Sequence, residues 1–155
     1  MSIDIGDKIP ALSAPASGGG TLKLAQDYTG QNLVVYFYPR DNTPGCTLEG
    51  QDFTRLYPQF EHANTAVVGV SKDSVKSHDN FCAKFGFPFK LLSDTDEAVC
   101  QAFGAIVEKS MYGKKYLGID RCTFLFNAKG KLVRVWRNVK AKGHAEEVLA
   151  AAQAL

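Results

Sequence analysis

Long apolar runs, a strong net charge and closely paired cysteines are all missing from this chain. Its 155 residues are 45% hydrophobic and 22% charged, with a formal net charge of +2. These values are typical of an ordinary globular protein, and we expect a single domain over residues 1–155. No segment approaches the length of a membrane span, and no basic cluster with interleaved aromatic residues predicts nucleic-acid binding. Because Met1–Ile5 lacks the basic and apolar regions of a signal peptide, we expect a cytoplasmic protein.

Metal-ligand and phosphate-loop spacings are missing as well. The four cysteines, Cys46, Cys82, Cys100 and Cys122, form no CxxC pair, and the three histidines form no i, i+4 pair. This argues against a zinc site and against a dithiol of the thioredoxin type. The run Gly18–Gly20 is not followed by Gly-Lys-Ser/Thr, so it is not a phosphate loop. In reducing surroundings we expect any disulfide here to be transient and catalytic.

The most informative stretch that is present combines a strand, a loop and a helix start. The run Leu33–Tyr38 is apolar, β-branched and aromatic, which predicts a strand buried on both faces, and Pro39 ends it. Thr43 suits the N-cap of a following helix and Pro44 suits its first position. Cys46 then lies in the first helical turn, where free N–H groups and the helix dipole favour the thiolate, the nucleophilic form.

An apolar stripe on this predicted helix indicates which way the cysteine points. Phe53, Leu56, Tyr57 and Phe60 fall at i, i+3, i+4 and i+7, a buried face, and Cys46 lies on roughly the same stripe. Its sulfur is therefore expected to face a pocket against the sheet. Position alone leaves two alternatives, a reactive thiol and a small buried hydrophobe at a well-capped helix start.

Strand and helix patterns alternate along the rest of the chain, as expected for parallel β-α-β units with right-handed crossovers. The predicted strands are Thr21–Leu24, Leu33–Tyr38, Thr65–Ser71 and Pro88–Leu92, the predicted helices are Ser74–Phe85 and Glu97–Phe103, and a hairpin over Cys122–Phe126 and Leu132–Trp136 precedes a final helix over Gly143–Leu155. The pattern predicts an α/β fold with a mixed central sheet flanked by helices.

Local signals mark where several elements begin and end. Ser74 is a plausible cap and Gly86 a stop for one helix, and Asp94 or Thr95 can cap the next. Pro58 should kink or interrupt the Cys46 helix near Tyr57. Two segments, residues 1–20 and 108–120, are expected to be irregular because proline, glycine and polar residues interrupt them.

Around the cysteine the chain resembles a known family. Pro39-x-x-x-Thr43-x-x-Cys46 matches the peroxiredoxin motif PxxxTxxC, and Thr43–Glu49 is similar to the peroxiredoxin Q branch, the bacterioferritin comigratory protein type. Further similar segments are Gly6–Pro10, Val67–Ser71 and Gly118–Phe124. The resemblance covers nearly the whole chain. It implies a thioredoxin-like fold and a thiol-dependent peroxidase that uses no cofactor.

The resemblance also implies roles for four residues. Cys46 would be the peroxidatic cysteine, Thr43 and Arg121 would hydrogen-bond the thiolate and the peroxide, and Pro39 would cover the site. Arginine suits this role because it is always charged and donates several directed hydrogen bonds. Each position also has a plainer interpretation: Thr43 as an N-cap only, Pro39 as a strand terminator only, and Arg121 as a surface partner of Asp120 or Asp41.

The resolving cysteine is less determined. Many members of the branch carry it five positions after the peroxidatic one, where this chain has Gln51. Others carry it in the helix after the next strand, which makes Cys82 the candidate. Cys122, beside the site arginine, is the competing candidate, and Cys100 is expected to be a core residue. The alternative for Cys82 is likewise a small core residue.

Helix geometry makes the proposed pairing a prediction about motion. Cys46 is at a helix start, whereas Cys82 lies about 12 Å along its own helix at 1.5 Å per residue. A disulfide needs Cα atoms within roughly 7 Å of each other, so Pro44–Glu49 and Phe81–Phe85 are expected to unwind on oxidation.

The resemblance further implies the substrates and partners. Hydrogen peroxide and organic hydroperoxides would be reduced, thioredoxin or alternatively glutaredoxin would recycle the enzyme, and the protein would be a monomer. Two other functions stay open: a one-cysteine peroxidase resolved by an external thiol, and a redox switch or binding module without turnover.

Overall fold

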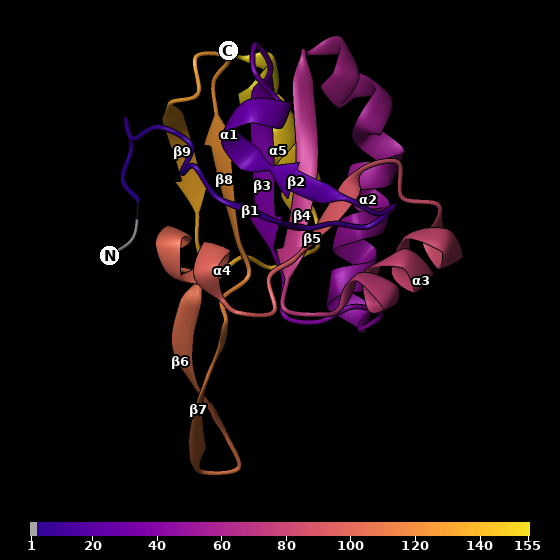
Figure 1. The fold of residues 1–155 in the computed structure, drawn as a ribbon, viewed down its shortest axis with the longest axis vertical. Coiled ribbons are helices and arrows are strands. Elements are labelled where there is room, and N and C mark those ends of the chain that lie inside the picture. The colour runs from indigo at the N-terminus through magenta and orange to yellow at the C-terminus, as the bar shows by residue number, and fades with distance from the viewer. Residues whose placement is uncertain (1–2) are drawn as a thin grey trace.

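A computed structural model describes residues 3–155, and a five-stranded mixed sheet runs through its middle (Figure 1). The strands lie in the order β5-β4-β3-β8-β9. Strands β3, β4 and β5 are parallel, β8 is antiparallel to β3, and β9 is antiparallel to β8. Their bounds are Asn32–Phe37 for β3, Thr65–Ser71 for β4, Lys90–Ser93 for β5, Cys122–Phe126 for β8 and Leu132–Trp136 for β9. The predicted mixed sheet is confirmed.

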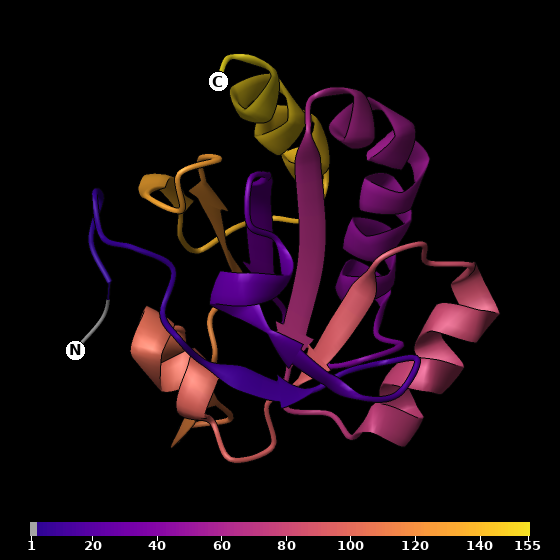
Figure 2. The same ribbon diagram turned by 45° about the horizontal axis from the view of Figure 1, so that its top comes forward.

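Helices cover both faces of this sheet (Figures 1 and 2). On one face α2 (Pro44–His62) and α5 (His144–Gln153) pack side by side, and α3 (Val75–Phe85) contributes to the same core. On the other face lie α4 (Ala98–Phe103) and the short α1 (Leu24–Asp27). The α/β architecture expected from the sequence, a sheet between two helical layers, is therefore what the chain forms.

The central strand shows why the sheet is buried on both faces. Leu33, Val35 and Phe37 point into one core, and Val34 and Tyr36 point into the other. Each of these five side chains is at most 1% exposed. A strand that is apolar at every position reads as a continuous run in the sequence because both of its faces need apolar side chains.

Several predicted boundaries are confirmed by their hydrogen bonds. Ser74 precedes α3 and its side chain accepts a hydrogen bond from the Ser77 N–H at 3.1 Å, while Gly86 ends the helix with a φ of 67°. Asp94, rather than Thr95, caps α4, since its carboxylate accepts from two backbone N–H groups at 3.0 and 2.7 Å. These ends form as predicted because each signal acts within a few residues.

The interruption predicted at Pro58 is wrong, because α2 continues without a break to His62. Pro58 lies on the exposed side of the helix. The carbonyl that loses its partner there is the one four residues earlier, and it can be hydrated at a solvent-facing position. Phe53 and Phe60, both fully buried on either side of the proline, hold the helix against the sheet.

The loop predicted for residues 108–120 is also wrong. The chain forms a two-stranded antiparallel hairpin from β6 (Ile106–Met111) and β7 (Lys114–Ile119), which projects from the body (Figure 1). We call it the arm. Its turn is made by Tyr112 and Gly113, with φ values of 52° and 77°. A two-residue turn with both φ values positive matches the twist of a hairpin, and Gly113 supplies that conformation without strain.

The N-terminal segment is more regular than predicted. Ser13–Pro15 forms β1 and pairs antiparallel with β2 (Thr21–Lys23), and Leu24 begins α1 instead of ending the strand. Met1 and Ser2, the start of the stretch predicted to be irregular, lie outside the described residues. In the part of the chain that the structure describes, no helix is long and apolar enough to cross a membrane.

We expect Gly69→Ala in β4 to lower the free energy of unfolding by about 1–3 kcal/mol, because a core without spare volume must shift to admit a methyl group. A Cβ at this position would lie 2.6 Å from the Leu91 side chain and 2.9 Å from the Tyr36 ring. Urea unfolding of both proteins measures the change. Ser110→Ala on the exposed arm is the control, and equal stability of the two variants would contradict the prediction.

Candidate active site

Cys46 lies in the first turn of α2 and is 2% exposed. The chain reaches it from the end of β3 through a short loop, and Pro44 begins the helix as predicted. Thr43 is the N-cap residue, but its hydroxyl does not cap; it donates to the Arg40 carbonyl at 2.9 Å. The sulfur joins the aromatic core between α2 and the sheet, so the expected inward orientation is confirmed.

Arg121 brings a positive charge directly onto this sulfur. Its Nη2 donates to the Cys46 Sγ at 3.3 Å, and its Nη1 donates to Glu49 Oε1 at 2.6 Å. The interpretation of Arg121 as a surface partner of Asp120 or Asp41 is wrong, because its ion pair is with Glu49 and its side chain is only 16% exposed. The charged donor makes this a charge-assisted hydrogen bond, a class stronger than a bond between neutral groups.

Two backbone features hold the arginine in place. Arg121 lies just before β8, whose first residue, Cys122, pairs with Phe37 at the end of β3. The Arg121 carbonyl also accepts a hydrogen bond from the Val139 N–H at 2.8 Å. On the side of Cys46, the residue before the cysteine is Gly45, and a Cβ there would lie 3.1 Å from Arg121 Nη2. Glycine before the cysteine therefore leaves room for the guanidinium to reach the sulfur.

Glu49 is a site residue that the sequence reasoning did not single out. It is fully buried, one helical turn after Cys46, and its Oε2 has no hydrogen-bond partner among the described residues. Burial raises the pKa of Glu49 to about 7, against the opposing effect of Arg121. The pKa of Arg121 is raised by Glu49 and Cys46, although burial alone would lower it. The i, i+3 spacing from Cys46 within one helix was the signal that could have identified Glu49.

Neither Thr43 nor Pro39 forms a hydrogen bond with the sulfur in the part of the chain that the structure describes. Thr43 is bound to Arg40, and Pro39 lies exposed directly after the buried Tyr38. Both belong to the loop that enters α2, so they border the site. Among the predicted residues, only Arg121 forms a hydrogen bond with Cys46 in the described part of the chain.

The remaining cysteines are divided between the two faces of the sheet. Cys82, on α3, is partly buried and packs against the same core as Cys46. Cys100 and Cys122 are fully buried in the core on the opposite face. Burial raises the pKa of all three thiols, that of Cys122 to about 12. All four cysteines are free thiols in this structure.

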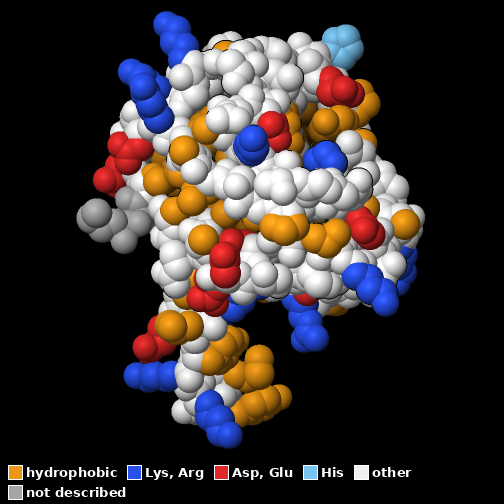
Figure 3. Space-filling view, viewed as in Figure 1, with side chains coloured by type: hydrophobic (Ala, Val, Ile, Leu, Met, Phe, Trp, Pro, Cys, Tyr) orange, Lys and Arg blue, Asp and Glu red, His pale blue; other side chains and the backbone are white. Residues whose placement is uncertain are grey.

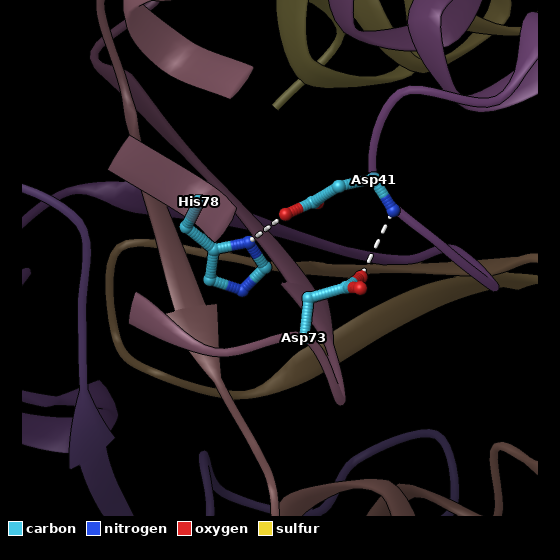
Figure 4. A group of neighbouring side chains, drawn as sticks. All are labelled: Asp41, Asp73 and His78. Atoms are coloured by element: carbon cyan, nitrogen blue, oxygen red, sulfur yellow. Dashed lines mark hydrogen bonds and ion pairs between the residues drawn. The ribbon is translucent and has the colours of Figure 1, made fainter. Parts of the chain in front are cut away.

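A buried polar cluster ties the loop before α2 to α3 (Figure 4). Asp41 Oδ2 accepts a hydrogen bond from Ser77 Oγ at 2.7 Å and lies 2.8 Å from His78 Nδ1. His78 Nε2 lies 3.0 Å from the Leu92 carbonyl, which can only accept, so Nε2 carries a hydrogen. The two ring nitrogens of His78 therefore link the loop before α2 to β5.

The same cluster has the composition of a cation site. Asp41, Asp73 and His78 place one ligand-type atom each within 4.8 Å of one another. Those atoms already take part in hydrogen bonds: Asp73 Oδ2 accepts from Ser71 Oγ at 2.6 Å and from the Asp41 N–H at 2.9 Å. A cation would have to displace these bonds. We therefore interpret the cluster as a connection between elements.

Comparisons with known proteins agree on one protein family. Residues 5–135 match the family model described as AhpC/TSA family. The chain is 58% identical over 136 residues to peroxiredoxin Bcp of Xanthomonas campestris pv. campestris, covering 88% of this chain and 85% of that protein.

Solved structures give the same result. A Xanthomonas campestris bacterioferritin comigratory protein, studied for its alkyl peroxide reduction activity, has a TM-score of 0.90 at 53% identity, covering 97% of this chain and 98% of that one. A cysteine-to-serine mutant of Xylella fastidiosa PrxQ has a TM-score of 0.93 at 50% identity, covering 99% and 98%. The thioredoxin-like fold expected from the sequence is thereby confirmed.

Glu49→Gln should change how stability depends on pH. The raised pKa means that the folded protein binds a proton at Glu49 more tightly than the unfolded chain does, so wild-type stability falls as pH rises from about 4.5 to about 7. The variant lacks this ionisation, and we expect a shallower fall over the same window in urea unfolding. Glu61→Gln, exposed on the same helix, should follow the wild type. Parallel curves for wild type and Glu49→Gln would contradict the assignment.

Proposed function

Because this chain belongs to the AhpC/TSA family, as a peroxiredoxin of the Bcp/PrxQ type, we propose that it reduces hydrogen peroxide and organic hydroperoxides through Cys46. A peroxiredoxin is a peroxidase. The observation that carries the assignment to this residue is the 3.3 Å hydrogen bond from Arg121 Nη2 to Cys46 Sγ at the start of α2. Organic hydroperoxides are included because the similar Xanthomonas campestris protein was studied for alkyl peroxide reduction.

In the first step the Cys46 thiolate attacks the terminal oxygen of a hydroperoxide, ROOH. The S–O bond forms as the O–O bond breaks, which leaves Cys46 as a sulfenic acid and releases RO⁻. That anion takes a proton from water and becomes the alcohol, or water where R is hydrogen. Arg121 remains beside the reacting atoms, where its positive charge stabilises the developing RO⁻.

The bordering residues have proposed parts in the same step. Thr43 uses its hydroxyl hydrogen on the Arg40 carbonyl, so its oxygen can still accept a hydrogen bond from the peroxide. Pro39 covers the approach to the sulfur. Glu49 positions Arg121, because one carboxylate oxygen holds the Nη1 while Nη2 stays directed at Cys46.

We assign Cys82 as the resolving cysteine. Its sulfur would attack the sulfenic sulfur of Cys46, forming the S–S bond, and the departing hydroxide would leave as water with the Cys82 proton. The placement of Cys82 on the same face of the sheet as Cys46 supports this pairing, whereas Cys122 points into the opposite core. Cys46 is at a helix start and Cys82 is well along α3, so the end of α3 and the first turn of α2 must unwind.

Electrons for the next cycle would come from thioredoxin, whose dithiol would reduce the Cys46–Cys82 disulfide to two thiols. We further propose that residues 1–155 act as one domain, in a monomer, in the cytoplasm. Similarity to the family supports thioredoxin as the donor and the monomer, and the length of the chain supports a single domain.

Peroxide consumption with thioredoxin, thioredoxin reductase and NADPH tests the first step. Cys46→Ser should abolish turnover, and Arg121→Ala should lower the rate constant for peroxide reduction by about 10²–10³, the usual cost of removing one preorganised donor from a developing charge. Arg55→Ala, an exposed arginine on α2, is the matched control and should leave the rate unchanged. Wild-type rates in Arg121→Ala would refute the arginine assignment. Stoichiometric oxidation without turnover would indicate a redox switch.

Mass mapping of the peroxide-treated protein tests the second step. We expect a Cys46–Cys82 disulfide in wild type and in Cys122→Ser, and a sulfenic or over-oxidised Cys46 in Cys82→Ser. If Cys82→Ser keeps full turnover with a small thiol and with thioredoxin, resolution is by an external thiol. A peptide linking Cys46 to Cys122 would show that the pairing proposed here is wrong.

A further inference from the structure

The arm is the least integrated part of the described chain. Its two strands pack on each other and make few contacts with other elements. Figure 1 shows it projecting past the end of the sheet at which β3 ends and α2 begins. Its second strand stops at Ile119, two residues before Arg121. The arm therefore lies at the same end of the sheet as Cys46 and Arg121.

Much of the exposed apolar surface of the chain is on this arm. Met111, Tyr112, Tyr116 and Leu117 are 56%, 98%, 43% and 67% exposed, and they make up four of the seven large hydrophobic side chains that are exposed in residues 3–155. Figure 3 shows hydrophobic side chains gathered along the arm. An arm that served only to connect two buried strands would not need them, since polar residues form such turns at lower cost.

Strand alternation separates these side chains into two faces. Met111 pairs with Lys114, and Lys109 pairs with Tyr116, so these four share one side, which we call the Met111 face. A Cβ on Gly118 would touch both Lys109 and Tyr116, which confirms that they meet there. The opposite side carries Leu117 together with the Lys115–Glu108 ion pair. The Met111 face is thus apolar and aromatic with two lysines and no carboxylate.

The arm and the segment that follows β9 carry more positive than negative charge. Residues 105–121 and 137–143 hold seven lysines and arginines against two aspartates and glutamates, whereas the whole chain has a net charge of only +2. The two segments meet at the site, where the Val139 N–H donates to the Arg121 carbonyl. A surface of this charge attracts acidic partners and repels basic ones.

We propose that the Met111 face, with Tyr112 at its tip, is the docking surface for the protein dithiol that reduces the oxidised enzyme, and that this partner is acidic and apolar around its thiols. The proposal rests on the function proposed above. In that step two electrons and two protons pass from the dithiol to the Cys46–Cys82 disulfide, which opens to two thiols while the partner forms its own disulfide.

A protein is favoured over a lipid surface because the proposed cycle requires a dithiol to reach this end of the sheet in every turnover. Tyrosine and methionine are enriched in the centres of protein interfaces, and lysines at a rim steer association more than they add affinity. The arm supplies exposed tyrosine and methionine as well as lysines, and it ends two residues before Arg121. A thioredoxin bound to the arm would lie at the end of the sheet where α2 begins.

Two neighbouring lysines on opposite faces allow a matched test with thioredoxin as the probe. Lys114→Glu and the double change Met111→Ser/Lys114→Glu alter the Met111 face, whereas Lys115→Glu makes the same charge reversal on the other side. The first two should raise the KM for thioredoxin at least fivefold and leave kcat within twofold. Lys115→Glu should change the KM less than twofold. Peroxide reduction driven by dithiothreitol should be the same in all four proteins.

Each other outcome has a definite meaning. Equal KM values for Lys114→Glu, Lys115→Glu and wild type would overturn the docking proposal, as would a wild-type enzyme that dithiothreitol recycles but thioredoxin does not. Binding to phosphatidylglycerol vesicles that is lost in Lys114→Glu, with thioredoxin kinetics unchanged, would assign the arm to a membrane instead. A wild type that consumes no peroxide with either reductant would overturn the proposed function itself, a result distinct from failure of the arm.

Discussion

The contact on which the site depends is the guanidinium of Arg121 held between a sulfur and a carboxylate. Its partners lie 75 and 72 residues away in sequence, so only the assembled sheet brings them together. The antiparallel pairing of β8 with β3 places Arg121 at the same end of the sheet as the start of α2. A Cβ at position 45 would lie 3.1 Å from Arg121 Nη2, so the glycine there leaves room for the guanidinium beside Cys46. Sheet order, helix position and a single glycine are therefore all constrained by one arginine.

Glu49 shows what this arrangement costs. A fully buried carboxylate with one unpartnered oxygen is unfavourable, and its raised pKa expresses that cost directly. The side chain nevertheless fixes one edge of the guanidinium, so the other edge has a single direction available, toward Cys46. Without such a partner the long arginine side chain would occupy several rotamers, because holding it in one rotamer costs conformational entropy. Stability is thus lowered locally in return for a preorganised donor at the sulfur.

Features decided within a few residues could be predicted from the sequence, and features decided by distant packing could not. The buried strand β3, the caps at Ser74 and Asp94, and the place of Cys46 in the first turn of α2 depend on near neighbours. The Arg121–Glu49 pair was missed because its partners are far apart in sequence, and Pro58 was misjudged because buried phenylalanines on both sides override its local effect. The arm was predicted as a loop because its strands face solvent, so neither strand shows the alternation of apolar and polar residues that marks a half-buried strand.

The buried cluster around Asp41 limits where the molecule can open for the proposed disulfide. Ser77 and His78, both in the first half of α3, are bonded to Asp41, which belongs to the loop leading into α2. Cys82 lies beyond these anchors, in the part of α3 that ends at Gly86. Because buried hydrogen bonds to Asp41 hold the first half, unwinding is cheaper in the second half, which is held by packing and by the helix's own hydrogen bonds. In the proposed disulfide formation, the cluster that has the composition of a metal site would therefore act as the fixed end of a helix whose other end moves.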